Sequence, residues 1–282
     1  MAWDFSTEPE FEAKLDWMRS FVREEIIPLE TLAEQWRTDD GRRVYRAITD
    51  PMKEAVKRQG LWAAHLPPEL GGGGFGQVKL GLMHEVLGQC VYAPSIFGNQ
   101  APDSGNAELI AVGGSDYQKR TWMQPLLDGK LRSCFSMTEP GAGADPTRLT
   151  TTAVLDGDEY VINGHKWFSS NASVSDFLIV MCKTGDADTS PYRAFSMIIV
   201  PRKTPGVNIL RDVPTMGEPD HRTGEPGGHA EILYESVRVP RANLIGQPGD
   251  GFALAQKRLG PGRIHHAMRW LGQSRRAFDM LC

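Results

Sequence analysis

The chain has 282 residues, of which 40% are hydrophobic, and a formal net charge of −4 at pH 7. This length and composition are typical of a globular protein with about two domains of about 100–200 residues each. The dispersed charge argues against nucleic-acid binding, and no run of about 18 apolar residues is present that would predict a membrane span.

Residues 1–131 have the pattern of an all-helical domain. Thr7 and Glu10 are spaced as in a capping box, and apolar residues then recur at helical spacing until Pro28. Further helices are predicted over residues 47–58, 78–87, 104–112 and 117–127.

A glycine-rich segment interrupts this domain. Gly71-x-Gly73-x-x-Gly76 has the spacing of a dinucleotide-binding fingerprint, but that fingerprint requires a preceding strand, and Pro67-Pro68 stand there instead. The segment is therefore interpreted as a glycine turn.

Short β-branched and apolar runs predict a compact β domain over residues 132–240. Asp156-Gly157 and Asn163-Gly164 have the signature of hairpin turns. Strands are predicted over residues 177–182, 194–200 and 229–234.

Within this domain, residues 135–145 read FSMTEPGAGAD. The small residues after Pro140 let backbone N–H groups approach an anionic or ring-shaped ligand, while the proline fixes the direction of the loop. A surface turn explains the same letters equally well, and Trp167 is equally compatible with a core aromatic.

Helical pattern returns within residues 241–282: it covers residues 251–259 and, past Pro261, residues 264–281, either as one long helix or as a kinked pair. Its apolar residues have no partner helix in the sequence, so we expect this face to pack on the preceding domains or on another chain. These residues are Met268, Leu271, Met280 and Leu281.

No metal site or disulfide framework is predicted. His265 and His266 are adjacent, so on a helix they point about 100° apart and do not share a metal as an i, i+4 pair does. The widely spaced cysteines are interpreted as reduced core thiols, which together with an acidic N-terminus makes the cytoplasm the expected compartment. They are Cys90, Cys134, Cys182 and Cys282.

Three motifs together resemble the acyl-CoA dehydrogenase family, and the resemblance covers essentially the whole chain. Residues 138–145 are similar to the family's TEPxxGSD signature, with Ala144 where serine is usual. Trp167 and Ser169 match a family tryptophan followed two residues later by Thr or Ser, and residues 234–252 resemble the family's F-E-x-V-x-V-P run. The resemblance implies an α+β fold with an N-terminal helical domain (1–131), a central β-barrel-like, flavin-binding domain (132–240) and the first helix of a truncated C-terminal bundle (241–282).

The resemblance further implies an oxidoreductase with FAD as cofactor. The reaction would be α,β-dehydrogenation of an acyl-CoA thioester in fatty-acid or related acyl-CoA catabolism. An electron-transfer flavoprotein would accept the electrons, and the full-length protein would be a homo-oligomer. A related oxidase or flavin monooxygenase and a non-catalytic fragment are the alternatives.

The same resemblance assigns site residues. Trp167 would lie along one face of the flavin, Ser169 would bond near its reactive N5 edge, and Glu139 would be structural. Ala144 and Arg263 would contact the acyl-CoA, although Gly260 replaces an Asp that is common three residues earlier. The implied cofactor-binding residues are Phe135, Ser136, Met137, Thr138, Gly143, Ala144, Trp167, Phe168 and Ser169.

The resemblance assigns no catalytic residue within this chain. Most family members carry the basic Glu in the C-terminal bundle, and a smaller subset carries it where this sequence has Gly262. We therefore expect the base to lie outside the given sequence and the chain to be inactive by itself.

Overall fold

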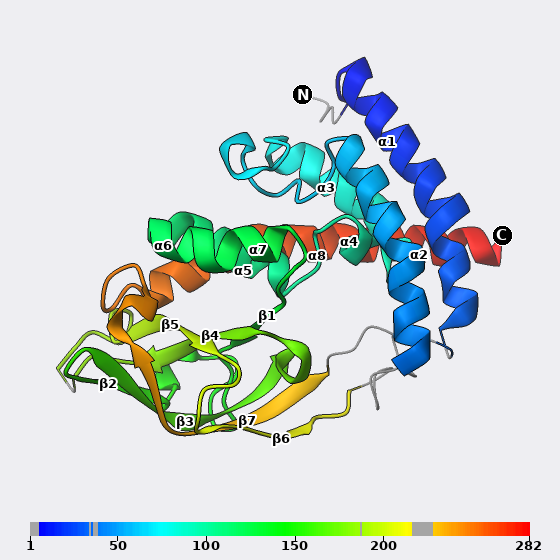
Figure 1. Ribbon diagram of the computed structural model, residues 1–282. Helices are drawn as coiled ribbons and strands as arrows, with labels where there is room; N and C mark the ends of the chain where they lie inside the picture. The colour runs from blue at the N-terminus through cyan, green and yellow to red at the C-terminus, as the bar shows by residue number, and fades with distance from the viewer. Residues whose placement is uncertain (1–5, 34, 36–38, 187, 216–227) are drawn as a thin grey trace. The chain divides into compact units, whose positions relative to one another are not determined.

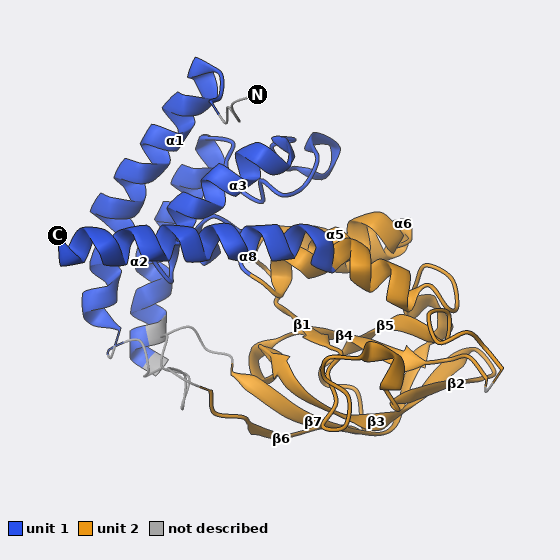
Figure 2. Cartoon of the chain, turned by 180° about the vertical axis from the view of Figure 1, so that it is seen from behind, with its two compact units in different colours: residues 1–100, 259–282 blue, residues 101–258 orange. Residues whose placement is uncertain are grey.

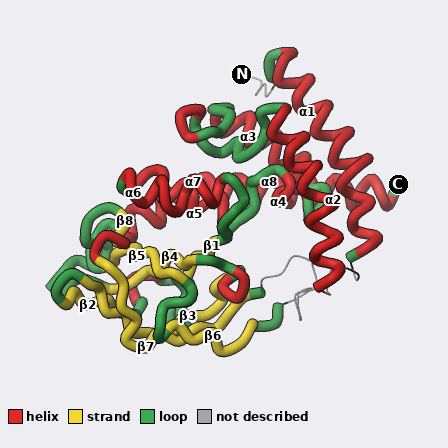
Figure 3. Tube along the Cα trace, viewed as in Figure 1, coloured by secondary structure: helices red, strands yellow, loops and turns green. Residues whose placement is uncertain are grey.

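The computed structural model describes residues 6–33, 35, 39–186, 188–215 and 228–282. It contains helices and one mixed β-sheet (Figures 1 and 3). Two compact units are distinguished: a helical unit of residues 1–100 and 259–282, and a sheet unit of residues 101–258 (Figure 2). This division differs from the predicted domains because the helices that precede the sheet contact it directly, as α5 does with β1.

The helical unit contains α1 (Pro9–Phe21), α2 (Asp39–Arg58), α3 (Gly76–Leu87), α4 (Ala93–Ile96) and most of α8 (Gly251–Leu281). Its core combines apolar residues of α1 with those of α3 and of the 90–97 segment. The predicted helices 47–58 and 78–87 are confirmed within α2 and α3.

The start and the end of the first helix differ from the prediction. Glu8 is the N-cap residue, and the Thr7 hydroxyl donates to Glu12 at 2.5 Å, so the predicted capping box is wrong. After α1, a π-helical turn (Val22–Ile26) and a 3₁₀ helix (Ile27–Leu32) continue the chain past Pro28. Pro28 lies in the first turn of that 3₁₀ helix, where its missing N–H leaves no helical hydrogen bond unmade.

The glycine turn is confirmed. A short 3₁₀ helix, Pro68–Leu70, leads into it, and Gly71, Gly74 and Gly76 have φ angles of 87°, 61° and 75°. These left-handed values favour glycine, which explains the composition of the segment without a nucleotide.

The sheet unit begins with helices α5 (Asp103–Gly113), α6 (Asp116–Gln118) and α7 (Gln124–Leu127), with a π-helical turn at Lys119–Met123. Both predicted helices in this stretch are confirmed. Ser115 and Gln118 form a capping box, because each side chain accepts a hydrogen bond from the other's backbone N–H.

The sheet has the order β6-β7-β3-β2-β4-β5-β8, and β1 pairs with β4 in parallel. β6 and β8 end this order and are not paired with each other, so the described strands do not close into a barrel. Nearly every residue of β4 and β5 is buried, so this part of the sheet is covered on both faces. The strands are β1 (Ser133–Ser136), β2 (Thr152–Asp156), β3 (Glu159–Ser170), β4 (Phe177–Lys183), β5 (Phe195–Pro201), β6 (Val207–Asp212), β7 (His229–Pro240) and β8 (Leu244–Ile245).

One of the two predicted hairpin turns is confirmed. β2 and β3 pair around Gly157, but Asn163-Gly164 lies inside β3, at a register shift against β7. A Cβ atom at Gly164 would lie 2.2 Å from the Thr151 hydroxyl oxygen. Glycine is therefore explained here by close packing at a β-bulge and not by a turn.

The C-terminal segment forms one helix, α8, with Pro261 inside it. Cys90, Cys134 and Cys182 are buried as predicted, whereas Cys282 is exposed, which corrects its interpretation as a core thiol. In the described part of the chain, no helix is sufficiently long and apolar to cross a membrane.

Candidate functional site

The loop of residues 137–145 follows β1 and is closed on itself by its backbone. Glu139 N–H donates to the Ala142 carbonyl at 3.2 Å, and Ala142 N–H donates to the Glu139 carbonyl at 3.0 Å. Pro140 and Gly141 are thereby presented as an exposed tip. The 137–145 loop thus has a defined shape without burial of its outer residues.

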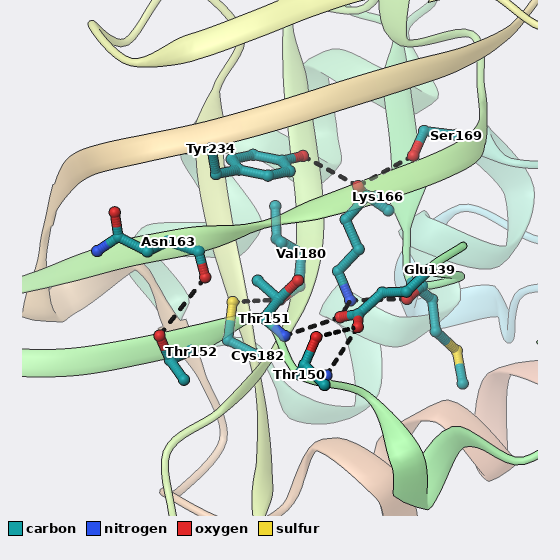
Figure 4. Close-up of polar contacts among 12 residues, drawn as sticks. Glu139, Thr150, Thr151, Thr152, Asn163, Lys166, Ser169, Val180, Cys182 and Tyr234 are labelled. Carbon is teal, nitrogen blue, oxygen red and sulfur yellow. Dashed lines mark hydrogen bonds and ion pairs between the residues drawn. The ribbon is translucent and has the colours of Figure 1, made fainter. Parts of the chain in front are cut away.

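Glu139 anchors this loop from inside. Its carboxylate accepts hydrogen bonds from the N–H and hydroxyl of Thr150, from the N–H of Thr151 and from Lys166 (Figure 4). Burial alone would raise its pKa, but the Lys166 ammonium and the hydrogen bonds from Thr151 and Thr150 overcome this and hold the pKa at about 2. Glu139 is therefore an ionised structural acceptor, and its low pKa and four donors make it a poor proton acceptor.

The outer side of the 137–145 loop offers backbone donors. Among the described residues, none accepts a hydrogen bond from the backbone N–H of Thr138, Gly143 or Ala144. Gly143 and Ala144 are exposed, and a Cβ atom on Gly143 would meet no atom within 4 Å. Open space beside N–H groups without acceptors fits an anionic ligand or the polar edge of a ring.

Strand β3 brings two aromatic residues beside this loop. Trp167 N–H donates to the Thr138 carbonyl at 3.0 Å, which joins the strand to the loop. A register shift between Lys166 and Ser169 follows, and Phe168 within it has a φ of 49° and 40% of its surface exposed. A phenylalanine with a positive φ and an exposed ring is uncommon. Because the pairing of β3 with β7 holds Phe168 in this strained conformation, Phe168 is a candidate ligand contact.

Ser169 lies inside the sheet unit, and its predicted bond near the flavin N5 edge stays a prediction. Its fully buried hydroxyl lies 3.0 Å from the Ser136 hydroxyl, which also accepts a hydrogen bond from Tyr234 at 2.9 Å. The bulge changes the alternation of the strand, so that Ser169 faces the core and the half-buried Ser170, bonded to His229, does not. The Ser136 and Ser169 hydroxyls therefore join β1 to β3 directly before the loop begins.

Phe135 is covered by a residue that the sequence analysis did not single out. The Arg258 guanidinium lies 3.8 Å from the centre of the Phe135 ring, and its Nε donates to Asn106 at 3.2 Å. Burial lowers the pKa of Arg258 to about 10, and burial raises the pKa of Glu108 to about 7 while Arg258 opposes that shift. Arg258 thus fixes Phe135, and with it the start of the 137–145 loop, by a cation–π contact.

A helical signal in the sequence identifies Arg258. Leu254 and Ala255 are buried on α8, and Arg258 follows them at i+4 and i+3, on the same face. An Arg on the apolar stripe of a helix predicts a buried partner. Lys166 has a comparable signal, since it stands at an inward position of β3.

Arg263 is exposed on the part of α8 that belongs to the helical unit, and its substrate contact stays a prediction. The His265 ring stacks on His84 at 4.1 Å, and the described residues contain no His, Cys, Asp and Glu grouping suited to a metal ion.

Comparison with known families gives matches for both halves of the chain. The acyl-CoA dehydrogenase N-terminal domain model matches residues 8–130, and the middle domain model matches residues 134–227. The 137–145 loop and strand β3 both lie in the middle-domain match.

Individual proteins agree with these matches. The chain is 40% identical to FadE2 of Mycobacterium tuberculosis, described as a probable acyl-CoA dehydrogenase, over 94% of this chain and 64% of that protein. It is 40% identical to human acyl-CoA dehydrogenase family member 11, of which it spans only 34%. A Mycobacterium abscessus protein assigned to the acyl-CoA dehydrogenases has a solved structure with a TM-score of 0.87 and 37% identity, covering 97% of this chain and 69% of that one.

Proposed function

Because this chain belongs to the acyl-CoA dehydrogenase family, we propose that it is the flavin-holding part of an enzyme that oxidises a saturated acyl-CoA thioester to its enoyl form. Its cofactor is FAD, which supplies the acceptor for the hydride that leaves the β-carbon. The observation that carries the proposal is the 137–145 loop, which leaves Gly143 and Ala144 exposed with no acceptor for their N–H groups among the described residues and is bonded to β3 at Trp167, next in sequence to the exposed Phe168.

The residues divide into two roles in this proposal. Thr138, Gly143 and Ala144 donate backbone hydrogen bonds to the polar edge of the flavin and to its phosphates. Trp167 and Phe168 supply aromatic surface for the ring system. The remaining predicted cofactor residues support these groups: Phe135, Ser136 and Ser169 from the sheet, and Met137 from the start of the 137–145 loop.

The chemistry also needs a base for the α-proton on the side of the substrate opposite the flavin. Glu139 is excluded from this role by its low pKa and its four donors. The chain spans about a third of the length of the human relative. We propose that the chain by itself does not turn over, and that the electron acceptor of the whole enzyme is an electron-transfer flavoprotein.

Titration of the purified chain with FAD tests the proposal. We expect the absorption spectrum of a protein-bound flavin, with affinity reduced in Phe168→Ala and unchanged in Leu210→Ala, which removes a similarly exposed apolar side chain from β6. A spectrum that stays that of free FAD throughout the titration, or two variants that bind equally, contradicts the proposed site. Rapid reaction of the reduced, bound flavin with oxygen would favour the oxidase alternative.

A further inference from the structure

A buried ion pair lies directly beneath the 137–145 loop. Lys166 has none of its surface exposed, and its Nζ lies 2.9 Å from a Glu139 carboxylate oxygen and 2.7 Å from the Met137 carbonyl oxygen (Figure 4). Lysine is almost never fully buried unless it is paired. The ammonium therefore connects strand β3 with two points of the loop at once.

Stability alone is a weak reason for such a pair. The desolvation of two charges offsets much of their attraction, and apolar residues of similar volume often replace buried pairs at no cost. Burial lowers the pKa of Lys166, and the Glu139 carboxylate opposes that shift. The contact that an apolar replacement does not reproduce is the hydrogen bond to the Met137 carbonyl.

That hydrogen bond determines where the next N–H group points. In a planar trans peptide the N–H of one residue is directed opposite to the carbonyl of the residue before it. Because the Met137 carbonyl points inward to Lys166, the Thr138 N–H points away from the buried ammonium. The Thr138 carbonyl is fixed in turn by Trp167 N–H, so this residue is held on both sides.

The charge of Lys166 also acts on the strength of this donor. A carbonyl that accepts a hydrogen bond from a cation is polarised, and polarisation strengthens the N–H of the same peptide as a donor. The Thr138 N–H has no acceptor among the described residues, so this strengthening is available to a ligand.

We propose that Lys166 is a positioning residue that acts through the Met137–Thr138 peptide to aim the Thr138 N–H at the flavin and to strengthen it as a donor. The inference rests on the proposed function. A stronger donor favours the more electron-rich form of its ligand, so Lys166 raises the affinity for reduced flavin more than that for oxidised flavin.

Three variants test the inference. Lys166→Met leaves Glu139 as an unpaired buried carboxylate, whereas the double variant Glu139→Gln/Lys166→Met removes both charges. Lys203→Met, at an exposed lysine of the same unit, is the control. The measurements are the urea midpoint of the flavin-free protein, the FAD dissociation constant and the reduction potential of the bound flavin.

We expect the urea midpoint to fall in Lys166→Met and to recover in the double variant. FAD affinity is expected to fall by a factor of about ten in both, because neither has a donor for Met137. A tenfold loss of preference for reduced flavin lowers the two-electron potential by about 30 mV, again in both variants. The control is expected to match the unmodified chain in all three measurements.

A double variant that recovers FAD affinity and potential together with its urea midpoint would show that the pair is only structural, and would overturn the inference alone. Failure of the unmodified chain to bind FAD would overturn the proposed function as well. Amide hydrogen exchange tests whether Lys166 positions Thr138. The Trp167 N–H should exchange faster in both Lys166 variants, and unchanged protection of this N–H contradicts the positioning of Thr138.

Discussion

Replacing Gly272 by Ala should destabilise the helical unit, although alanine is the better helix former. A Cβ atom at Gly272 would lie 1.8 Å from the Glu85 carbonyl oxygen on α3. A carbon and an oxygen are in comfortable contact at about 3.3–3.6 Å, so α8 and α3 would have to separate by about 1.5 Å. The obstacle is backbone, which has no rotamer through which it can move aside.

The magnitude follows from two opposing effects. Overpacking of this kind costs about 1–3 kcal/mol, and the higher helix propensity of Ala returns about 1 kcal/mol. The expected net loss is therefore up to about 2 kcal/mol. A Cβ atom added to Gly88 would likewise lie 2.1 Å from the Arg269 carbonyl oxygen. The two segments are therefore also in close contact at a second point.

Gly262→Ala on the same helix is the matched control. A Cβ atom there meets no atom within 4 Å, so this variant should gain about 0.5–1 kcal/mol. Both changes restrict the unfolded chain equally, so the difference between them reports the helix crossing alone. Urea unfolding followed by the helical circular dichroism signal measures it. Equal stabilisation by the two substitutions would refute the close packing of α3 and α8.

Three further predictions concern other parts of the molecule. Burial lowers the pKa of His265 to about 4, and nearby His65, Arg269 and His266 add to the shift, so the unfolded chain gains protons below pH 6.5 before the folded chain does. Stability should therefore fall as the pH drops from 6.5 towards 4, by on the order of 1–2 kcal/mol at pH 5, and a His265→Gln variant should show a shallower fall in its unfolding midpoint. Arg258→Ala should cost about 2–3 kcal/mol through loss of the contacts with Phe135 and Asn106, while Lys257→Ala, at an exposed neighbour, should stay within about 0.5 kcal/mol; similar urea midpoints for the two would contradict the cation–π assignment. Ser169→Ala should lower stability by about 1 kcal/mol with little change in FAD affinity, and the opposite pattern would place its hydroxyl at the ligand.

The local sequence pattern was sufficient to predict the structure wherever one segment determines its own conformation. The helices over residues 104–112 and 117–127 follow from apolar spacing, and the turn at Gly157 follows from its hairpin signature. The motif at residues 138–145, together with Trp167, Ser169 and the run at residues 234–252, carries the resemblance to the family. These features depend on neighbours within a few residues along the chain.

Features that depend on residues distant in the sequence could be identified only in the folded structure. Asn163-Gly164 has the letters of a hairpin turn, yet Thr151 packs against the glycine and makes it a bulge. The same effect of pairing between β3 and β7 turns Ser169 inward and leaves Phe168 exposed. Which face of a strand a residue occupies at a bulge is decided by the partner strand, and that partner is about 60 residues away in the sequence.

The sequence by itself therefore determined the family, many of the helices and strands, and the 137–145 loop that we propose as the flavin site, because these depend on short motifs and periodicities. Only the tertiary structure decided that Lys166 and Glu139 meet beneath that loop and that Arg258 covers Phe135. A buried charge is tolerated only where a partner from elsewhere in the chain compensates it, and folding alone brings those partners together.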